Sequence, residues 1–450
     1  SCGLVATQAY AKVDAEQAAK LGGAELTPMG ANAAANADGS IPAWSGKMKS
    51  APEGMKYAGS GDIYPDPYAD EQPLFTITSA NFSKYADKLS AGQVALFNKF
   101  PDTFTMNVYP THRDGRYNDL IEKRTAWNAT NTSFVNGVDG LKNYTGGAPF
   151  PIPKDGAEVI WNARTIHPHP TIVGVMDDMA VYLNGNRQMR RQSYVTEFPY
   201  AYKENAVGKV DGEIGINAGL IHVTVEQPKR QKGQMTIVHE ALDQVEHERK
   251  AWVYIPGARR VRRAPTVGFD TPDGPGGLIT VDDALGFNGA LSRFNWKLIG
   301  KKEHYIPYNN YDLDDPKVSY DELLGEDHIN PDLMRYELHR VWQVEATLKE
   351  GARHVYAKRI FYLDEDTWFI QLADSYDGRG NLWRTNMATI VYNPNLPGPY
   401  ARVWTYNDLD SDVYAVEKLL NEQESYDNLQ IPILPLDVFT PSGIRMFSRQ

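Results

Sequence analysis

The feature that most constrains the fold is a long succession of strand-like segments between residues 171 and 393, with no helical pattern between them. Residues 220–226 (LIHVTVE) show the pattern most clearly, because Ile221, Val223 and Val225 alternate with the other side chains and would share one face. A strand with one apolar face is typical of a half-buried antiparallel sheet. Polar turns separate the segments, which predicts an antiparallel meander.

Turn signals divide this region into individual strands. Asn184-Gly185 is the strongest two-residue hairpin signal, and it splits residues 171–195 into two strands. The other strands are expected, in chain order, at residues 220–226, 234–239, 250–255, 258–263, 291–298, 337–348, 353–363, 367–374 and 383–393. Residues 394–450 are expected to form Pro-punctuated loops and one helix.

Helical patterns lie outside the strand-rich region. Residues 13–21 predict a short helix with Asp14 as its N-cap, and Ser90 and Gln93 form an S-x-x-Q capping box at the start of another. Residues 22–72 are rich in Gly, Ala, Pro, Asn and Asp, and we expect an extended arm laid over the rest of the protein. The remaining helices are expected from Ser79 and at residues 117–127, 154–163 and 412–425.

Composition excludes several classes of protein. The chain has 450 residues, 42% of them apolar, which is enough to build a core, and its formal net charge of −11 argues against general nucleic-acid binding. No apolar run approaches the roughly 18–20 residues of a membrane helix, so no transmembrane segment is expected. The single Cys excludes an intramolecular disulfide. No P-loop or GxGxxG motif is present, and no cofactor is expected.

The N-terminal residues are compatible with export by two routes. In one, Ala9-Tyr10-Ala11 is a cleavage site and residues 1–11 are a signal-peptide remnant; in the other, Cys2 carries a lipid. A frayed start without either role is the third interpretation. We expect one integrated domain with four parts, namely the remnant (1–11), an arm with helices that pack on the sheet (12–165), the antiparallel sheet (166–410), and a C-terminal helix with a Pro-rich tail (411–450).

Several long sequence blocks resemble one known family. They are residues 26–44 (LTPMGANAAANADGSIPAW), 252–265 (WVYIPGARRVRRAP), 287–311, 335–368 and 376–384 (YDGRGNLWR). These blocks are similar to the signature blocks of domain-of-unknown-function family 1329, and the resemblance spans nearly the whole chain. The family has no settled activity.

A more distant resemblance connects these blocks to LolA/LolB-like carriers and other outer-membrane lipoprotein-sorting proteins. The matches are Ile255-Pro256, the segment from Arg259 to Arg263, and Phe287-Asn288-Gly289. The resemblance implies an α+β fold in which helices cover the concave face of a strongly curved antiparallel sheet, an incomplete β-barrel whose cavity holds acyl chains. It also implies a Gram-negative periplasmic protein, free or attached to the outer membrane, with an RND-type exporter and an outer-membrane protein as partners.

A carrier of this kind needs an apolar lining, because burial of hydrocarbon is worth roughly 25 cal/mol per Å². On a curved sheet every second residue faces the hollow. The residues that alternation nominates for the lining are Trp252, Tyr254, Phe294, Trp296, Leu338, Arg340, Trp342, Val344, Tyr356 and Tyr362. Each could equally face a sealed core, which is the usual place for such side chains.

The basic run from Arg259 to Arg263 is dense for an acidic protein. Alternation puts Arg260 and Arg262 on one face, so these two are candidates for contact with lipid head groups or an acidic partner. The alternative is a solvated strand whose arginines pair with carboxylates such as Asp282 and Asp283.

No pattern nominates an active site or a metal site. His167-Pro168-His169 has a chelating spacing that an ordered proline loop explains equally well, and His339 and His354 could pair across successive strands. Asp364-Glu365-Asp366 crowds carboxylates as a Ca²⁺ site or an acid–base pair would, but a solvated turn is the simpler interpretation. Since no G-x-S-x-G motif exists either, neither a catalytic residue nor a metal ligand is assigned.

Three functions are compatible with these observations. The preferred hypothesis is a carrier for a lipid-like or otherwise hydrophobic small molecule, with no enzymatic activity. The second is an accessory subunit that docks an exporter or an outer-membrane protein and carries nothing. The third is a secreted hydrolase of hydrophobic esters or glycoconjugates, which would need a His joined to a carboxylate or hydroxyl in a cleft.

Overall fold

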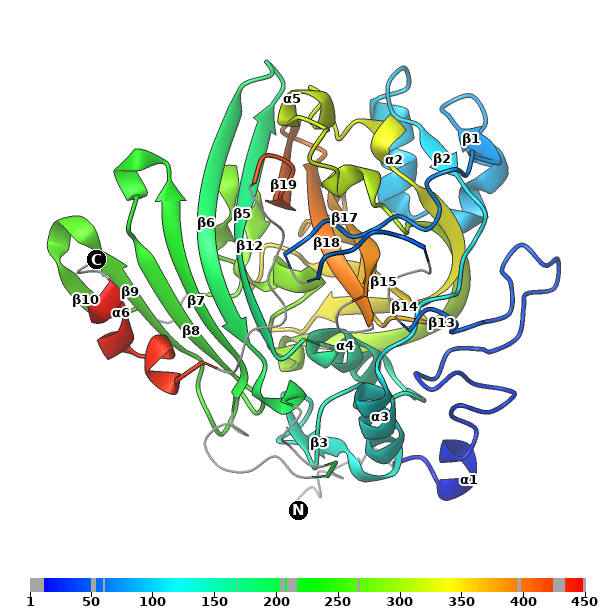
Figure 1. Ribbon diagram of the computed structural model, residues 1–450, viewed down its shortest axis with the longest axis horizontal. Helices are drawn as coiled ribbons and strands as arrows, with labels where there is room; N and C mark the ends of the chain where they lie inside the picture. Colours follow the sequence, from blue (N-terminus) through cyan, green and yellow to red (C-terminus); the bar gives the residue numbers. More distant parts are fainter. Residues whose placement is uncertain are drawn as a thin grey trace.

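The computed structural model describes residues 12–49, 54–59, 61–167, 169–202, 207–208, 217–264, 268–394, 398–423 and 434–447. The fold is mixed α+β and is built on one 15-stranded, mostly antiparallel sheet (Figure 1). Its strands are β1 (Phe75–Ile77), β2 (Met106–Val108), β5 (Thr171–Tyr182), β6 (Arg187–Glu197), β7 (Asn217–Gln227), β8 (Met235–Ala241), β9 (Lys250–Ile255), β10 (Arg260–Arg263), β13 (Phe294–Pro307), β14 (Tyr336–Leu348), β15 (Lys358–Asp364), β16 (Ile370–Tyr376), β17 (Leu382–Asn393), β18 (Gly398–Asp408) and β19 (Val413–Leu419). Two small hairpins stand apart, β3 (Ser133–Val135) with β4 (Gly140–Lys142) and β11 (Pro272–Asp273) with β12 (Ile279–Thr280).

The sheet joins two antiparallel meanders. One runs from β5 to β10 and the other from β13 to β19, and they meet where β19 pairs with β5. At the far edge, β1 pairs with β2, and β2 pairs in parallel with β14 through Val108 and Tyr336. The strands expected between residues 171 and 393 all form, and Asn184-Gly185 lies in the turn between β5 and β6. The predicted succession of antiparallel strands is therefore confirmed.

Two expectations near the C-terminus are wrong. Residues 398–408, expected to be loop, form β18, and the helix expected at residues 412–425 is instead β19. Val413, Val416 and Leu419 are spaced as on a helix. The segment nevertheless fills the place between β18 and β5 and is hydrogen bonded on both sides, so tertiary pairing outweighs the local period.

The helices are short, and most precede the large sheet. They are α1 (Ala15–Ala18), α2 (Ala91–Lys99), α3 (Asp119–Asn131), α4 (Gly156–Thr165), α5 (Tyr320–Leu323) and α6 (Pro441–Phe447). The predicted caps are confirmed. The Asp14 carboxylate accepts from Gln17 N at 2.7 Å. Ser90 Oγ accepts from Gln93 N at 3.1 Å, while Gln93 Oε1 accepts from Ser90 N at 2.9 Å.

The region before the sheet departs from expectation at one helix. The segment after Ser79 forms a 3₁₀ helix, η1 (Phe82–Lys88), because Asn81 at its start bonds back to the main chain of Thr76 and Thr78 and does not cap an α-helix. Part of the expected arm contacts the turn between β15 and β16, where Trp368 Nε1 donates to Met29 O at 2.9 Å.

In the described parts of the chain, three clusters of buried apolar residues hold the sheet, the smallest formed by Tyr64, Tyr311, Val391 and Tyr400. The main core lies where α2 and α4 pack on the strands of the second meander. A smaller core joins β7 and β8 to α6 and to the 3₁₀ helix η11 (Leu436–Phe439), with Leu220, Ile237, Phe439 and Ile444 at its centre. In the part of the chain described here, no helix combines the length and the apolarity that crossing a membrane requires. Residues 1–11 lie outside the described residues, so both export interpretations stay predictions.

Candidate functional site

An apolar cavity of about 210 Å³ lies against the sheet where the two meanders meet. Its wall comes from β5, β6, β7 and β18, from the end of α4 and the residues after it, and from the loop around the 3₁₀ helix η7 (Val281–Gly286). Most of the wall is apolar, with Met176 and Phe369 among its members. An apolar cavity of about 150 Å³ is known to hold a benzene ring, so this one can take part of a hydrophobic molecule.

Strand register brings the lining residues together. Ile172 of β5 pairs with Thr196 of β6, which pairs with Ile221 of β7, and in the next row Tyr194 pairs with Val223. Alternate residues of a strand point to opposite faces, so these rows face the cavity while their neighbours face away from it. All five are only half-buried.

The η7 loop closes one side of the cavity and is anchored from behind by buried ion pairs. Asp282 Oδ2 accepts from His354 Nε2 at 3.0 Å, and Asp283 Oδ1 accepts from Arg359 Nη2 at 2.6 Å. Leu285, between these anchors and the cavity, has a positive φ of 55° and is 41% exposed. An apolar side chain therefore stands at the rim of the cavity.

Three rings that carry nitrogen belong to this apolar wall: those of His167, His169 and Trp404. His167 stacks on Phe198 with ring centroids 3.8 Å apart. Both ring nitrogens of His169 and the Trp404 Nε1 are buried and have no hydrogen-bond partner among the described residues. Burial lowers the pKa of both histidines to about 3, so both imidazoles are neutral at pH 7.

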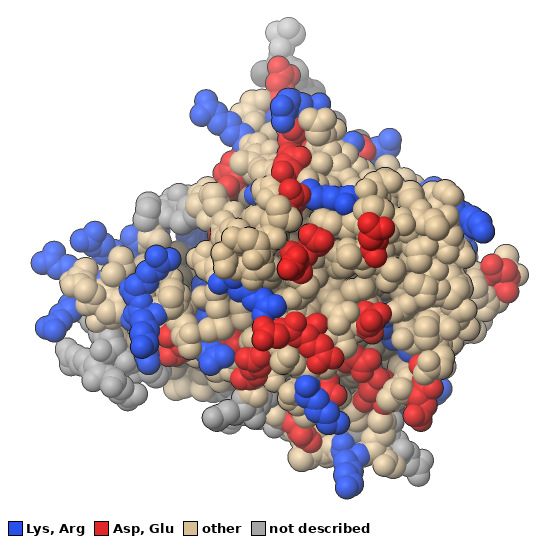
Figure 2. Space-filling view, turned by 90° about the horizontal axis from the view of Figure 1, so that it is seen from above, with Lys and Arg blue, Asp and Glu red and all other residues tan. Residues whose placement is uncertain are grey.

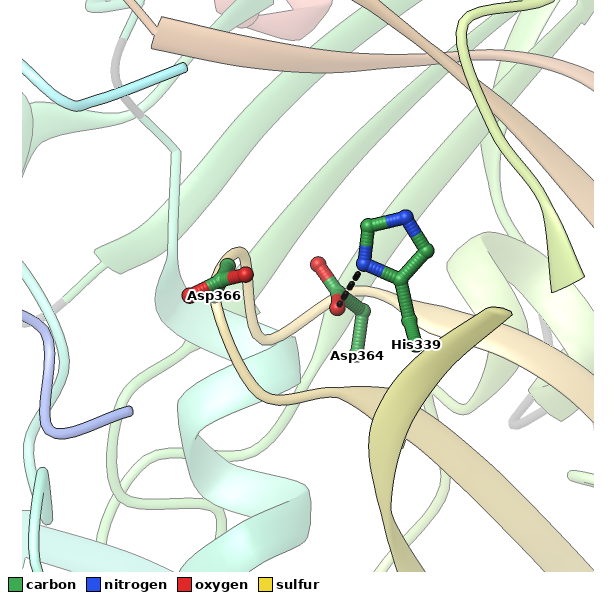
Figure 3. A group of neighbouring side chains, drawn as sticks. All are labelled: His339, Asp364 and Asp366. Carbon is green, nitrogen blue, oxygen red and sulfur yellow. Dashed lines mark ion pairs between the residues drawn. The ribbon is translucent and has the colours of Figure 1, made fainter. Parts of the chain in front are cut away.

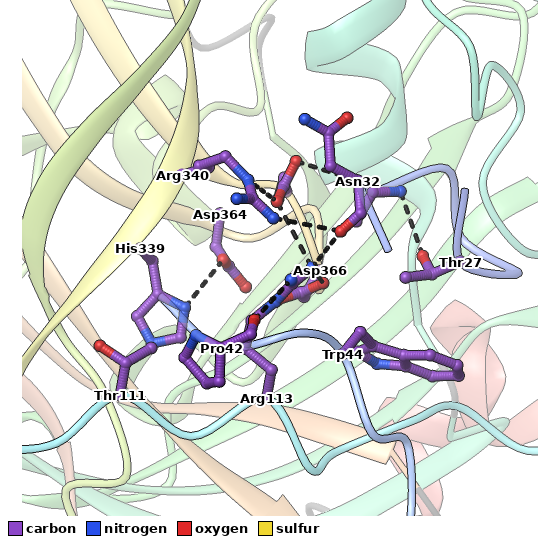
Figure 4. A network of polar contacts seen from close by, with 12 residues as sticks. Thr27, Asn32, Pro42, Trp44, Thr111, Arg113, His339, Arg340, Asp364 and Asp366 are labelled. Carbon is purple, nitrogen blue, oxygen red and sulfur yellow. Dashed lines mark hydrogen bonds and ion pairs between the residues drawn. The ribbon is translucent and has the colours of Figure 1, made fainter. Parts of the chain in front are cut away.

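A second cluster joins the N-terminal arm to the turn after β15 (Figure 4). We call it the arm clamp, and its members are Asn32, Arg113, Arg340, Glu365 and Asp366. Asp366 accepts from Arg113 Nε and Nη2 at 2.7 and 2.8 Å, and Glu365 Oε1 accepts from Arg340 Nε at 2.6 Å. Both arginines also donate to Asn32 O, at 2.7 and 3.2 Å. Each charge of the clamp thus has an opposite charge or a carbonyl beside it.

His339, Asp364 and Asp366 are close enough to hold a metal ion, since one ligand atom of each lies within 4.8 Å of the others (Figure 3). Both oxygens of Asp366 are already bonded to Arg113, and the Tyr308 hydroxyl donates to Asp364 Oδ2 at 3.2 Å. Burial raises the pKa of Asp364 to about 6, with the Asp366 carboxylate as the next cause. A metal ion would have to displace Arg113, so the arrangement fits a clamp better than a metal centre.

Two other histidines, His239 and His247, line a second cavity of about 460 Å³ together with Glu246 and Glu248. His339 and His354 do not pair with each other, because Glu337 Oε2 lies 3.0 Å from His339 Nε2 and Asp282 holds His354. These contacts lie outside the wall of the cavity of about 210 Å³. The segment Asp364-Glu365-Asp366 leads into the expected turn, but the carboxylates of Glu365 and Asp366 are buried and bonded to the arginines of the clamp. The absence of enzymatic activity stays a prediction, as does the hydrolase alternative.

The ten residues nominated from alternation lie in several places. Four are buried in the main core: Phe294, Leu338, Val344 and Tyr362. Two pack at its margin: Trp296 and Trp342. Two pack on the smaller core beside α6: Trp252 and Tyr254. Two make polar contacts: Arg340 in the arm clamp, and Tyr356, whose hydroxyl donates to Asp283 Oδ2 at 3.0 Å. None of the ten lines the cavity of about 210 Å³. A ligand contact by any of them stays a prediction.

Arg260 and Arg262 are exposed on β10, at the end of the sheet. The pairing suggested between this basic run and Asp282 or Asp283 is wrong, because both carboxylates are buried against Arg359. The two arginines remain candidates for contact with head groups or a partner.

Sequence reasoning missed most of the cavity wall. The alternation of Ile221 and Val223 marked an apolar face, and that signal alone could have nominated both. The sequence does not nominate Trp404, because residues 394–450 are expected to form loops and one helix, whereas Trp404 lies on β18. His167 and His169 carry no signal that separates a cavity wall from an ordered loop.

Comparison with known proteins identifies the family to which this chain is similar. Residues 76–445 match the family described as "Protein of unknown function (DUF1329)". The "Uncharacterized protein PA3922" of Pseudomonas aeruginosa is 44% identical over 449 residues, which are 98% of this chain and 95% of that protein.

Two solved structures are similar at low identity. One is the crystal structure of a DUF1329 family protein from Desulfovibrio piger, with 13% identity, a TM-score of 0.42, and 61% of this chain and 92% of that chain covered. The other is a LolA superfamily protein from Nitrosomonas europaea, with 13% identity, a TM-score of 0.37, and 64% and 98% covered. The family match spans most of the sequence and the Pseudomonas relative nearly all of it, and the chain therefore belongs to the DUF1329 family.

Proposed function

We propose that the protein binds a hydrophobic small molecule or lipid in the cavity between β5–β7, β18 and α4 and carries it through the periplasm. The observation that carries this proposal is the apolar cavity of about 210 Å³. A hydrophobic ligand gains roughly 25 cal/mol for each Å² of apolar surface that it removes from water. The half-buried Ile221 and Val223 would complete their own burial in the same step.

In this proposal the sheet curves around the cavity as an incomplete barrel, and α4 and the η7 loop cover its concave side. The supporting observation is that the wall draws on strands of both meanders and on both covering segments. Leu285, at the rim, is the first apolar side chain that an arriving or departing ligand would touch.

The proposed carrier is a periplasmic protein, free or attached to the outer membrane, that hands its ligand to a membrane partner. An RND-type exporter and an outer-membrane protein are the candidate partners, and this part of the proposal rests on the sequence resemblance. A non-carrying accessory subunit of such an exporter is the alternative, and the exposed Arg260 and Arg262 would suit it as well. Binding of an exporter by protein that is free of any ligand would favour that alternative.

A matched pair of substitutions tests the proposed cavity. Val223→Phe places a ring in the cavity, whereas Val245→Phe makes the same change at a side chain that is 60% exposed. Titration of delipidated protein with the apolar dye N-phenyl-1-naphthylamine should show saturable binding, weakened about tenfold or more by Val223→Phe only, since tenfold is about 1.4 kcal/mol. Circular dichroism checks that both variants are folded. Equal dye affinity in the two variants, or no saturable binding by the wild type, would contradict the proposal.

A further inference from the structure

The tips of two neighbouring hairpins carry a group of exposed cations, which we call the basic tip. A Cβ placed on Gly233, in the turn between β7 and β8, would lie 3.3 Å from Pro256 Cγ in the turn between β9 and β10, so the two turns touch. The exposed cations on and beside these turns are Lys229, Arg230, Lys232, Arg259, Arg260 and Arg262. Figure 2 shows Lys and Arg side chains gathered at this end of the molecule, on the side where Figure 1 places β9 and β10.

Within the described ranges, the basic tip lacks the ion pairs that neutralise other arginines of this chain. Among the residues that the structure describes, neighbouring Arg263 lies 3.8 Å from Glu248, but no carboxylate pairs with a member of the basic tip. Arg113 and Arg359, by contrast, are held by carboxylates inside the protein. The formal net charge of the whole chain is −11, so the rest of the molecule is net negative while this end is positive. Such an asymmetry orients a protein in front of a negatively charged surface.

An apolar side chain accompanies the cations. Ile255 is 50% exposed and is the register partner of Arg260. A large apolar side chain beside an exposed Arg suits the boundary between lipid head groups and acyl chains, where the cation meets phosphates and the apolar group enters the boundary. Four of the cations stand on the projecting turns of the two hairpins, and Arg260 and Arg262 follow on β10, a shape that suits a flat surface.

We propose that the basic tip docks this protein on an anionic lipid surface. Attraction of the six cations to acidic phospholipids supplies the binding, and Ile255 adds a small apolar contribution. Salt screens such attraction over about 8–10 Å, so binding should weaken steeply as ionic strength rises. Docking does not require an occupied cavity, and it would stand even if the proposed carrier function failed.

Co-sedimentation with lipid vesicles tests the docking. Wild-type protein should bind vesicles that contain phosphatidylglycerol and should dissociate from them at high salt. It should not bind vesicles of phosphatidylcholine alone. The double variant Arg260→Glu with Arg262→Glu should bind about tenfold or more weakly, because two cations of the cluster are replaced by anions. The cavity variant Val223→Phe should bind vesicles as the wild type does, which separates this result from the test of the carrier function.

A control variant matches the change in charge. Lys349→Glu with Arg379→Glu makes the same replacement at exposed turns of the second meander and should leave vesicle binding unchanged. Absence of binding to phosphatidylglycerol vesicles would overturn the proposal, as would equal loss in the two double variants or equal binding to phosphatidylcholine. Capture of an acidic protein that depends on Arg260 and Arg262, without any vesicle binding, would assign the tip to a protein partner and overturn the lipid assignment.

Discussion

The cavity and the arm clamp differ in whether their buried polar groups have partners. In the clamp, Arg113 and Glu365 have side chains only 1% exposed, and each is bonded to opposite charges or carbonyls. In the cavity wall, His169 and Trp404 are 1% and 2% exposed, yet their ring nitrogens are unpaired among the described residues. A buried polar group without a partner costs about 1–3 kcal/mol. The clamp therefore leaves these buried charges paired, whereas the cavity wall carries the energetic cost of unpaired polar groups.

The largest effect is expected in the arm clamp. Arg113→Met would leave the buried Asp366 carboxylate with uncompensated charge and should lower the free energy of unfolding by about 3–5 kcal/mol, as measured by urea denaturation. Arg187→Met is the control, because its partner Asp321 is 94% exposed, and it should cost less than about 1 kcal/mol. A similarly small loss of unfolding free energy in both variants would mean that the arm clamp is no more important for stability than an exposed ion pair.

The next effect compares two isoleucines on opposite faces of neighbouring strands. Ile237 is fully buried under α6, and Ile237→Ala should cost about 2–5 kcal/mol. Ile221 faces the cavity, and Ile221→Ala in ligand-free protein should cost about 1 kcal/mol or less, because little packing is lost there. Equal losses in thermal or urea unfolding would mean that the cavity is packed in solution.

Part of the fold around these residues could be predicted from the sequence alone. The alternation around Ile221 and the Asn184-Gly185 turn predicted the first meander, because period-2 patterns and hairpin turns are local signals. Local pattern failed at residues 413–419, where pairing with β5 decides the structure. It also could not tell which apolar face stays open, since a cavity arises where strands, α4 and the η7 loop meet without filling the space. That outcome depends on contacts between distant segments.

The third effect is a pH dependence in the cavity wall. Burial lowers the pKa of His169 to about 3, below its ordinary value of 6.5, so the unfolded chain takes up a proton first as pH falls. The stability tied to the neutral imidazole is complete above pH 6.5 and is lost progressively toward pH 3. Between pH 7 and pH 5, wild type should therefore lose about 2 kcal/mol more than His169→Phe. Parallel pH profiles of the two proteins would show that this histidine is solvated when folded.

The central claim is that the cavity holds a hydrophobic molecule in the native setting. The most direct measurement is mass spectrometry of the organic extract of denatured protein purified from its native host. Wild type and Val245→Phe should release a near-stoichiometric hydrophobic molecule, and Val223→Phe should release little or none. An extract without such a molecule in the wild type, or the same yield from both variants, would contradict the claim.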